Sequence, residues 1–308
     1  MPLSGELLSK SAFLLAASML LPVCSKAQLA PTNERGVTMG HWHSIVLDVE
    51  ASKKFWMLFG AEPITIDGTA VMKLPGILIF LTQGTSTGST MGTSLNHVGL
   101  RVSNGKDLKD RLKAAGVKED PTDPVTGRPG FWKPGLRGWG NVYSADGLKI
   151  EILDNVVEGE AGLTAKIAGV ADPTQKKDLP PVASDHNHMY LPTKASVKEA
   201  EEWYSKMFGA QSFSDTGDGA LLPGARLRMD AAELRADSPG NPGPTKGHVI
   251  DHIGFEINHL QVFCQTLAAA GVKFEQPFSE KRHKSFASAE LVDPWGTSIE
   301  LTEGLSKF

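Results

Sequence analysis

The chain repeats one pattern four times: a histidine near the start of a short apolar run that leads into a helix-like stretch. The four histidines are His41, His97, His186 and His252. Residues 95–118 align without a gap to residues 250–273, and residues 40–63 match residues 185–212 with a few insertions. Two kinds of segment therefore alternate along the chain: one kind begins at residues 40 and 185, and the other at residues 95 and 250. This repeat constrains the architecture more than any other feature, because each copy is expected to form the same supersecondary unit.

Each copy predicts a strand, then a helix, then short strands. The first strands are expected at residues 41–47, 95–102, 186–191 and 250–257. Asp48 has a side chain suited to cap the helix that follows the first of these strands. A glycine ends each predicted helix, where it accepts a left-handed backbone. These glycines are Gly60, Gly116, Gly209 and Gly271.

Composition narrows the class of protein. The 308 residues suffice for two domains, and 41% hydrophobic with 21% charged residues is typical of a globular chain. The formal net charge is −4 without a basic patch, which argues against a nucleic-acid groove. No apolar run approaches the roughly 20 residues that span a bilayer. We expect a small-molecule substrate, no nucleic-acid partner and no transmembrane segment in the mature chain. Assembly into a homo-oligomer is possible but is not determined by the composition.

The N-terminus has the pattern of an export signal. An apolar stretch at residues 11–23 follows Lys10, and Ser25 and Ala27 are small residues at the −3 and −1 positions of a cleavage site. Residues 1–27 are therefore predicted to be a signal peptide, and the mature protein to be periplasmic or secreted. A disordered apolar tail is one alternative. A lipoprotein attached through Cys24 is another, although Val23 is larger than the residue usual before a lipidated cysteine.

Each half of the chain carries the residues of a metal site. Two of the four copies end in similar phrases, DGLKIEIL with Glu151 and DPWGTSIEL with Glu300. Because side chains alternate across a strand, one residue from each strand can point into a shared cup. Two imidazoles and one carboxylate bind Fe(II), Mn or Zn and leave positions free for substrate and dioxygen.

These repeats and motifs resemble the vicinal oxygen chelate superfamily, which includes glyoxalase I, bleomycin-resistance proteins and extradiol dioxygenases. The resemblance rests on His41 with Asp48, Ser52 and Phe55-Trp56, and on the closing run Asp293 to Glu300. It implies an α+β fold of four βαβββ modules, paired into two cupped mixed-sheet domains with a metal in each cup.

The resemblance also implies domain bounds and ligands. The expected domains are residues 38–155 and 184–304, joined by a linker at 156–183. Carried over onto this sequence, the metal ligands of the first domain are His41, His97 and Glu151. Those of the second domain are His186, His252 and Glu300. A divalent cofactor follows, with Fe(II) or Mn favoured and Zn or Ni as alternatives.

Two ligand positions stay open. His43 and His188 each form a His-x-His pair, and both members of a pair face the same side of a strand, so either is an alternative ligand or a neighbour of the ligands. The spacing to Asp48 favours His41 over His43. Phe80 and Arg228 stand where an acidic residue would supply a fourth ligand. That departure from the glyoxalase I pattern favours a three-ligand, oxygenase-like site.

Two further residues are candidates for catalysis. His283 lies at a distance that the extradiol pattern permits, although Glu290 occupies that pattern's tyrosine position. The alternative is that His283 has no catalytic role and lies in a solvated turn, since it belongs to the charged run EKRHK. Tyr143 lies three residues before Asp146. The alternative is that Tyr143 has no catalytic role, since tyrosine is common in strands. His283 could act as a general acid or base, and Tyr143 is a second candidate for a catalytic role.

Three function classes follow. The first is a metal-dependent enzyme on small molecules, with an extradiol-type dioxygenase foremost. The second is a glyoxalase-type lyase or isomerase that uses the metal only as a Lewis acid. The third is a non-catalytic binding protein like the bleomycin-resistance proteins. The metal that is bound and the consumption of oxygen would separate the three.

Overall fold

A computed structural model describes residues 29–120, 139–154, 181–212, 219–235, 238 and 240–308. The predicted signal peptide with Cys24 lies outside the described residues, as does the predicted linker up to residue 180. Among the helices that the structure describes, none is both long enough and apolar enough to cross a membrane.

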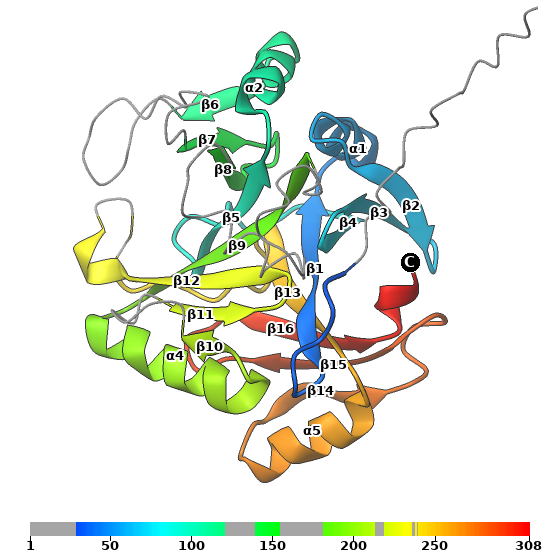
Figure 1. Cartoon of the computed structure of the whole chain (residues 1–308), viewed down its shortest axis with the longest axis vertical. Helices are drawn as coiled ribbons and strands as arrows, with labels where there is room; N and C mark the ends of the chain where they lie inside the picture. Colours follow the sequence, from blue (N-terminus) through cyan, green and yellow to red (C-terminus); the bar gives the residue numbers. More distant parts are fainter. Residues whose placement is uncertain (1–28, 121–138, 155–180, 213–218, 236–237, 239) are drawn as a thin grey trace, which may run out of the picture.

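The described residues form four βαβββ modules (Figure 1). Module 1 contains β1 (Val37–Val46), α1 (Val49–Met57), β2 (Glu62–Ile66), β3 (Thr69–Leu74) and β4 (Ile77–Gln83). Module 2 contains β5 (Leu95–Val102), α2 (Gly105–Ala114), β6 (Lys118–Asp120), β7 (Trp139–Tyr143) and β8 (Lys149–Asp154). Module 3 contains β9 (Val182–Leu191), α4 (Lys194–Phe208), β10 (Gln211–Ser212), β11 (Gly219–Leu222) and β12 (Ala225–Ala231). Module 4 contains β13 (Ile250–Ile257), α5 (Leu260–Ala269), β14 (Phe274–Ser279), β15 (Ala287–Val292) and β16 (Ser298–Glu303).

The helix boundaries arise from the residues that the sequence singles out. The Asp48 carboxylate accepts a hydrogen bond from the Ala51 amide at 3.0 Å, so it caps α1 as predicted. The four predicted terminators all adopt positive φ, from 68° at Gly209 to 91° at Gly271. Two short 3₁₀ turns follow the last strands of modules 3 and 4, at Ala232–Leu234 and Leu305–Lys307.

The strands form two mixed eight-stranded sheets, each made from two modules. We call the sheet of modules 1 and 4, the first and last modules along the chain, the outer sheet. Its strand order is β14-β15-β16-β13-β1-β4-β3-β2. We call the sheet of modules 2 and 3, the middle modules along the chain, the inner sheet. Its strand order is β10-β11-β12-β9-β5-β8-β7-β6. In each sheet the two modules meet through an antiparallel pair, β1 with β13 and β5 with β9, and parallel pairs flank it. The predicted fold class of paired βαβββ modules is confirmed.

The pairing of modules differs from the order along the chain. The sequence analysis placed modules 1 and 2 in one domain, at 38–155, and modules 3 and 4 in another, at 184–304. Both expected pairings are wrong, because each sheet takes one module from each half. The repeats report which segments are similar but carry no information about which strand edges meet. Consecutive modules do touch, through helices and turns: the Tyr204 hydroxyl of α4 donates to Asp293 at 2.8 Å.

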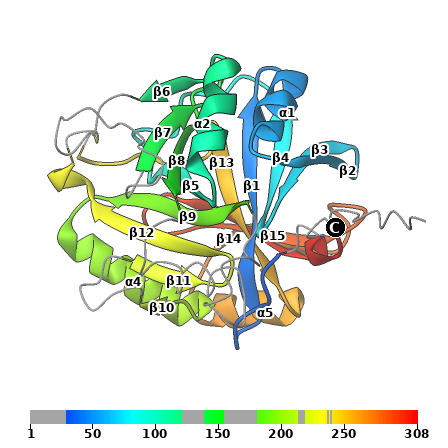
Figure 2. The same ribbon diagram turned by 45° about the horizontal axis from the view of Figure 1, so that its top comes forward.

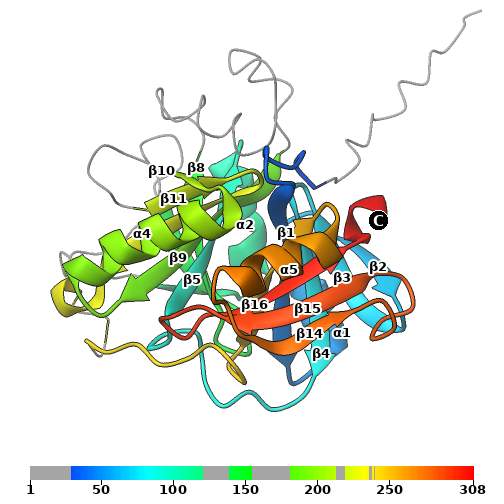
Figure 3. The ribbon, with the colours of Figure 1, turned by 90° about the horizontal axis from the view of Figure 1, so that it is seen from below.

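One face of each sheet packs into a common core, and the other face carries the histidines. Along β1, Trp42 is fully buried in the core, whereas its neighbours His41 and His43 point to the opposite face. Trp42 Nε1 donates to Asn187 Oδ1 of β9 at 2.7 Å, which ties the two sheets together on their core faces. Helices α1 and α2 lie side by side at one end (Figure 2), and α4 and α5 lie side by side at the other (Figure 3).

Candidate metal centres

Three donors converge on the outer sheet and form the outer site. They are His41 from β1, His252 from β13 and Glu300 from β16, all buried. His41 Nε2 lies 3.0 Å from Glu300 Oε2, and His252 Nε2 lies 3.5 Å from the same oxygen. These contacts come from the three central strands of the sheet, so the site depends on modules 1 and 4 together.

His252 is oriented by the residue that precedes it. Its Nδ1 donates to Asp251 Oδ1 at 2.7 Å, and Asp251 Oδ2 accepts from the Gly247 amide at 2.7 Å. Burial alone would lower the pKa of His252, but the hydrogen bonds with Asp251 and Glu300 raise it to about 9. The two carboxylates therefore favour positive charge at this point of the outer site.

The second histidine of the first His-x-His pair lies beside the outer site. His43 Nε2 contacts Thr82 Oγ1 at 2.7 Å, and its ring lies 4.6 Å from the ring of His252. Burial and the neighbouring imidazoles lower the pKa of His43 to about 3, so this ring is neutral. Phe80 fills the position of the missing acid and stacks on His43 at 5.9 Å. This side of the outer site is thus uncharged.

His283, predicted as a catalytic candidate, lies at the outer site. Its Nε2 is 3.4 Å from Glu300 Oε1, the oxygen that His41 and His252 leave free. Its ring stacks on Phe286 with 4.0 Å between centroids. Asp67, in the turn between β2 and β3, fixes the loop by accepting from the amides of Lys284 and Ser285. The loop is therefore anchored to module 1 and holds His283 against the donors.

Four donors converge on the inner sheet and form the inner site. They are His97 from β5, Glu151 from β8, and His186 and His188 from β9. Glu151 Oε2 lies 3.1 Å from His97 Nε2 and 2.9 Å from His186 Nε2. His188 Nδ1 lies 3.1 Å from His97 Nε2. Here both members of the His-x-His pair contribute a donor.

Each inner histidine has an oxygen acceptor on its outward nitrogen. His97 Nδ1 donates to Asn96 Oδ1 at 2.8 Å, His186 Nδ1 to Asp185 Oδ1 at 2.7 Å, and His188 Nε2 to Asp230 Oδ2 at 3.0 Å. A neutral imidazole that donates outward presents a lone pair inward. Burial is the largest cause that lowers the pKa of His188, to about 4, and that lowers the pKa of His97 well below its usual value. The inward nitrogens therefore present lone pairs to one another.

A buried ion-pair cluster supports the inner site. Asp185 accepts from Arg101 Nε at 2.9 Å and also pairs with Arg226, and all three side chains are at most 4% exposed. Burial would raise the pKa of Asp185, but the two guanidinium groups hold it far below its usual value. Asp185 is thus ionised and joins β5, β9 and β12 while it orients His186.

The structure regroups the predicted ligands. All six predicted ligands lie in one of the two clusters, but the expected set of His41, His97 and Glu151 is divided between them. The expected set of His186, His252 and Glu300 is divided in the same way. The reason is the crossed pairing of modules, since each site needs the first strands of two modules and the last strand of one.

Sequence reasoning missed the acceptors that orient the histidines. Three ligand histidines follow directly after an Asn or Asp, in Asn96-His97, Asp185-His186 and Asp251-His252. That dipeptide is a signal in the sequence that could have identified the acceptors. The fourth histidine that the sequence predicted as a ligand, His41, follows Gly40, and its Nδ1 is buried without a hydrogen-bond partner among the described residues.

Tyr143, the other catalytic candidate, lies on β7. Its position on the strand faces Lys149 of β8, two residues from Glu151. Its hydroxyl donates to Met91 Sδ at 3.9 Å, and Lys118 Nζ lies 5.6 Å from its ring centre. A catalytic role for Tyr143 stays a prediction.

The donor geometry fits a divalent ion in both sites. An ion bonded at about 2.1 Å separates neighbouring donors by about 3.0 Å in an octahedron and about 3.4 Å in a tetrahedron. Two of the three donor pairs in the outer site are 3.0 and 3.5 Å apart, and three of the six pairs in the inner site are 2.9 to 3.1 Å apart. All donors of each site lie within 4.8 Å of one another. Among the described residues, His41 Nε2, His252 Nε2 and His186 Nε2 are buried without a hydrogen bond of acceptable geometry. Such converging, unsatisfied nitrogens are the arrangement expected of ligands that share one ion.

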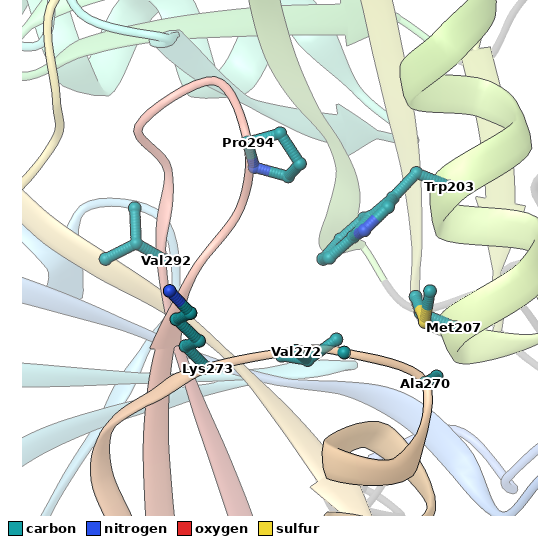
Figure 4. A pocket seen from close by; sticks show the side chains of 8 residues that line it. Trp203, Met207, Ala270, Val272, Lys273, Val292 and Pro294 are labelled. Atoms are coloured by element: carbon teal, nitrogen blue, oxygen red, sulfur yellow. The ribbon is translucent and has the colours of Figure 1, made fainter.

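A separate hollow of about 210 Å³ lies between α4 and the turn after α5 (Figure 4). None of the metal-site donors lines it. Its lining residues are Trp203, Met207, Ala270, Gly271, Val272, Lys273, Val292 and Pro294.

Comparisons with known proteins place the fold. Residues 187–301 match the family model of the Glyoxalase/Bleomycin resistance protein/Dioxygenase superfamily. Glyoxalase I from Zea mays is similar in structure with a TM-score of 0.60 and 16% identity, covering 88% of this chain and 94% of that one. A putative dioxygenase from Bacillus subtilis subsp. subtilis str. 168 has a TM-score of 0.55 and 15% identity, covering 90% and 86%. No curated protein sequence matches the chain. At such identities the two structural likenesses concern the fold alone.

Proposed function

We propose that the chain is a metal-dependent enzyme acting on a small molecule, because residues 187–301 match the family model of the glyoxalase/bleomycin resistance protein/dioxygenase superfamily. The observation that carries the proposal is the convergence of His41, His252 and Glu300 with two buried imidazole nitrogens left unsatisfied. When bound, a divalent ion such as Fe(II) or Mn(II) supplies a Lewis acid with free coordination positions.

The outer site is the proposed reactive centre, because it has the smaller donor set. Two imidazoles and one carboxylate leave coordination positions for a substrate, whereas the inner site gathers three imidazoles and one carboxylate. The inner site, with its three oriented histidines, resembles a closed structural site more closely. We therefore assign a metal to both sites and the chemistry to the outer one.

His283 is the proposed proton acceptor of the reaction. In the part of the chain that the structure describes, its Nε2 is buried without a hydrogen bond of acceptable geometry and lies 3.4 Å from Glu300 Oε1, so it faces the donors. Phe286 and the Asp67 contacts hold the ring in place. A substrate hydroxyl that entered beside Glu300 would meet His283 as a base, and the hydroxyl group would leave its proton on the imidazole.

The proposed reaction class is extradiol-type cleavage, in which both atoms of dioxygen enter a vicinal diol substrate. A three-donor site and an adjacent histidine support this class, as does the absence of an acid at position 80, where Phe80 lines the site. One feature departs from that chemistry: Glu290 replaces a tyrosine. Glu290 stands directly opposite Glu300 on β15 and pairs with Lys246 at 3.0 Å.

Metal analysis with oxygen consumption tests this function. The purified mature protein would be analysed for bound metal beside the His252→Ala and His97→Ala variants, and then supplied with a panel of catechols under oxygen-electrode detection. We expect two ions per chain, loss of one ion in His252→Ala, and oxygen uptake that His252→Ala abolishes. Bound Zn or Ni with turnover of thiol-conjugated aldehydes and no oxygen uptake would instead identify the lyase class. Protein that binds a small molecule without metal would refute the proposal.

We also propose that the protein is exported. The support is the pattern of Lys10, the apolar stretch at 11–23 and the small residues before position 28. N-terminal sequencing of the mature protein tests this: a start at Gln28 supports cleavage after Ala27, a lipid-modified Cys24 supports the lipoprotein alternative, and an intact Met1 refutes both.

A further inference from the structure

A glycine lies at the centre of each metal site. In the inner sheet Gly99 of β5 stands between Glu151 on β8 and His186 on β9. In the outer sheet Gly254 of β13 stands between Glu300 on β16 and His41 on β1. Both glycines follow a ligand histidine by two residues, in the motif His-x-Gly, so they share its face of the sheet.

The donors that flank each glycine meet directly above it. Neighbouring strands are about 4.8 Å apart, so residues on the two strands beside the glycine have backbones about 9.6 Å apart. Their side chains nevertheless close to 2.9 Å between His186 Nε2 and Glu151 Oε2, and to 3.0 Å between His41 Nε2 and Glu300 Oε2. That approach requires the space that a central side chain would occupy.

A single methyl group at either glycine would collide with an imidazole ring. A Cβ on Gly254 would lie 1.9 Å from His41 Cε1, and a Cβ on Gly99 would lie 2.1 Å from His186 Cε1. Neither glycine has a positive φ, so the backbone itself would accept alanine. The atoms that must move belong to a ligand side chain, and the expected damage is to the site rather than to the strand.

We propose that Gly99 and Gly254 are positioning residues of the two metal centres. Each leaves the space in which a histidine ring from one strand and a glutamate from the other come together around an ion. The two residues of the His-x-Gly motif then have complementary roles. The histidine supplies a donor, and the glycine leaves space for the donor of the paired module. This inference rests on the proposed metal function.

The two glycines differ in how much else holds the ring above them. Asp185 orients His186 through Nδ1, whereas His41 Nδ1 has no hydrogen-bond partner among the residues that the structure describes. An aspartate at position 40 would not supply one easily, because a Cβ on Gly40 would lie 3.0 Å from the Glu256 amide nitrogen. Gly254 is therefore expected to matter more for the outer site than Gly99 does for the inner site.

The experiment compares Gly254→Ala, Gly99→Ala and a control, Gly243→Ala, whose added Cβ would meet its nearest atom at 3.7 Å. Bound metal per chain and metal affinity are measured on the full-length proteins, together with circular dichroism. We expect Gly254→Ala to lose the outer ion and keep the inner one, and Gly99→Ala to bind the inner ion at least about tenfold more weakly. The control should retain both ions. The ion kept by each variant shows that its chain is folded.

Crystal structures of the same variants, prepared with a chelator, give a second readout. The inference predicts that the His41 ring in Gly254→Ala moves away from Glu300, beyond the 3.0 Å separation of the unsubstituted chain. Unchanged affinity in both alanine variants, with the rings unmoved, would overturn it. If the unsubstituted protein bound no metal, the proposed function would fail, and the ring positions alone would decide the role of the glycines.

Discussion

Replacing Asp185 by asparagine tests the buried charge cluster that supports the inner site. Asp185 is 1% exposed and balances two guanidinium groups, Arg101 and Arg226, that are also buried. Asparagine has nearly the same shape, so the change removes the negative charge and leaves the volume. Both buried guanidinium groups then lose the Asp185 charge, and His186 loses a charged acceptor.

The magnitude follows from the burial of the pair. Removing one partner of a buried ion pair costs about 3–5 kcal/mol of unfolding free energy. In a chain of this size that corresponds to a decrease in Tm on the order of 10 °C. Asp110→Asn is the matched control: it breaks an i,i+4 pair with Lys106 on the exposed surface of α2, where we expect no measurable change.

The assay is urea unfolding of both variants in the presence of EDTA, so that metal binding does not contribute. The low pKa of Asp185 fixes the sign of the pH dependence. A carboxyl whose folded-state pKa is depressed contributes stability above its unfolded pKa, about 3.9, and loses that contribution as the pH falls toward the folded value. The difference between the unsubstituted chain and Asp185→Asn should be constant from pH 5 to 8 and shrink below about pH 4. A difference no larger than that of Asp110→Asn at pH 7 would refute the reasoning.

Two further predictions concern single histidines. His283→Gln should keep both ions and lower kcat by about 100-fold, because it removes a proton acceptor but no metal donor; loss of the outer ion in this variant would show that His283 is a ligand instead. His188→Ala should weaken the inner ion by at least about tenfold, whereas His43→Ala, whose Nε2 is engaged by Thr82, should leave the outer ion bound; equal effects of the two would contradict the difference in donor number.

The sequence predicted the modules and the donors but not their grouping. Self-similarity, the phrases around Glu151 and Glu300, and the resemblance to the vicinal oxygen chelate superfamily predicted six of the seven residues in the two clusters as ligands and the seventh, His188, as an alternative ligand. Strand pairing between modules depends on which edges pack after folding, and the repeats of the sequence are the same for either pairing. The crossed arrangement in which β1 meets β13 was therefore beyond the reach of spacing arguments.

The supporting residues illustrate a second limit. Arg101, Asp185 and Arg226 come from three strands of two modules, and none of them is marked as part of a site by its local sequence. Gly99 and Gly254 read as ordinary strand glycines until the register places a ligand on each side. In both cases the missing information is the lateral order of strands, which the sequence encodes only through the packing of the whole core.

Metal content of two double variants tests the central claim most directly. His41→Ala/Glu300→Ala removes two donors from the outer site, and His41→Ala/Glu151→Ala removes one donor from each site. The crossed pairing predicts two tightly bound ions in the unsubstituted chain, one in the first variant and none in the second, where the inner site keeps three donors and binds its ion at least about tenfold more weakly. One ion in the second variant and none in the first would show that consecutive modules share an ion, which contradicts the account.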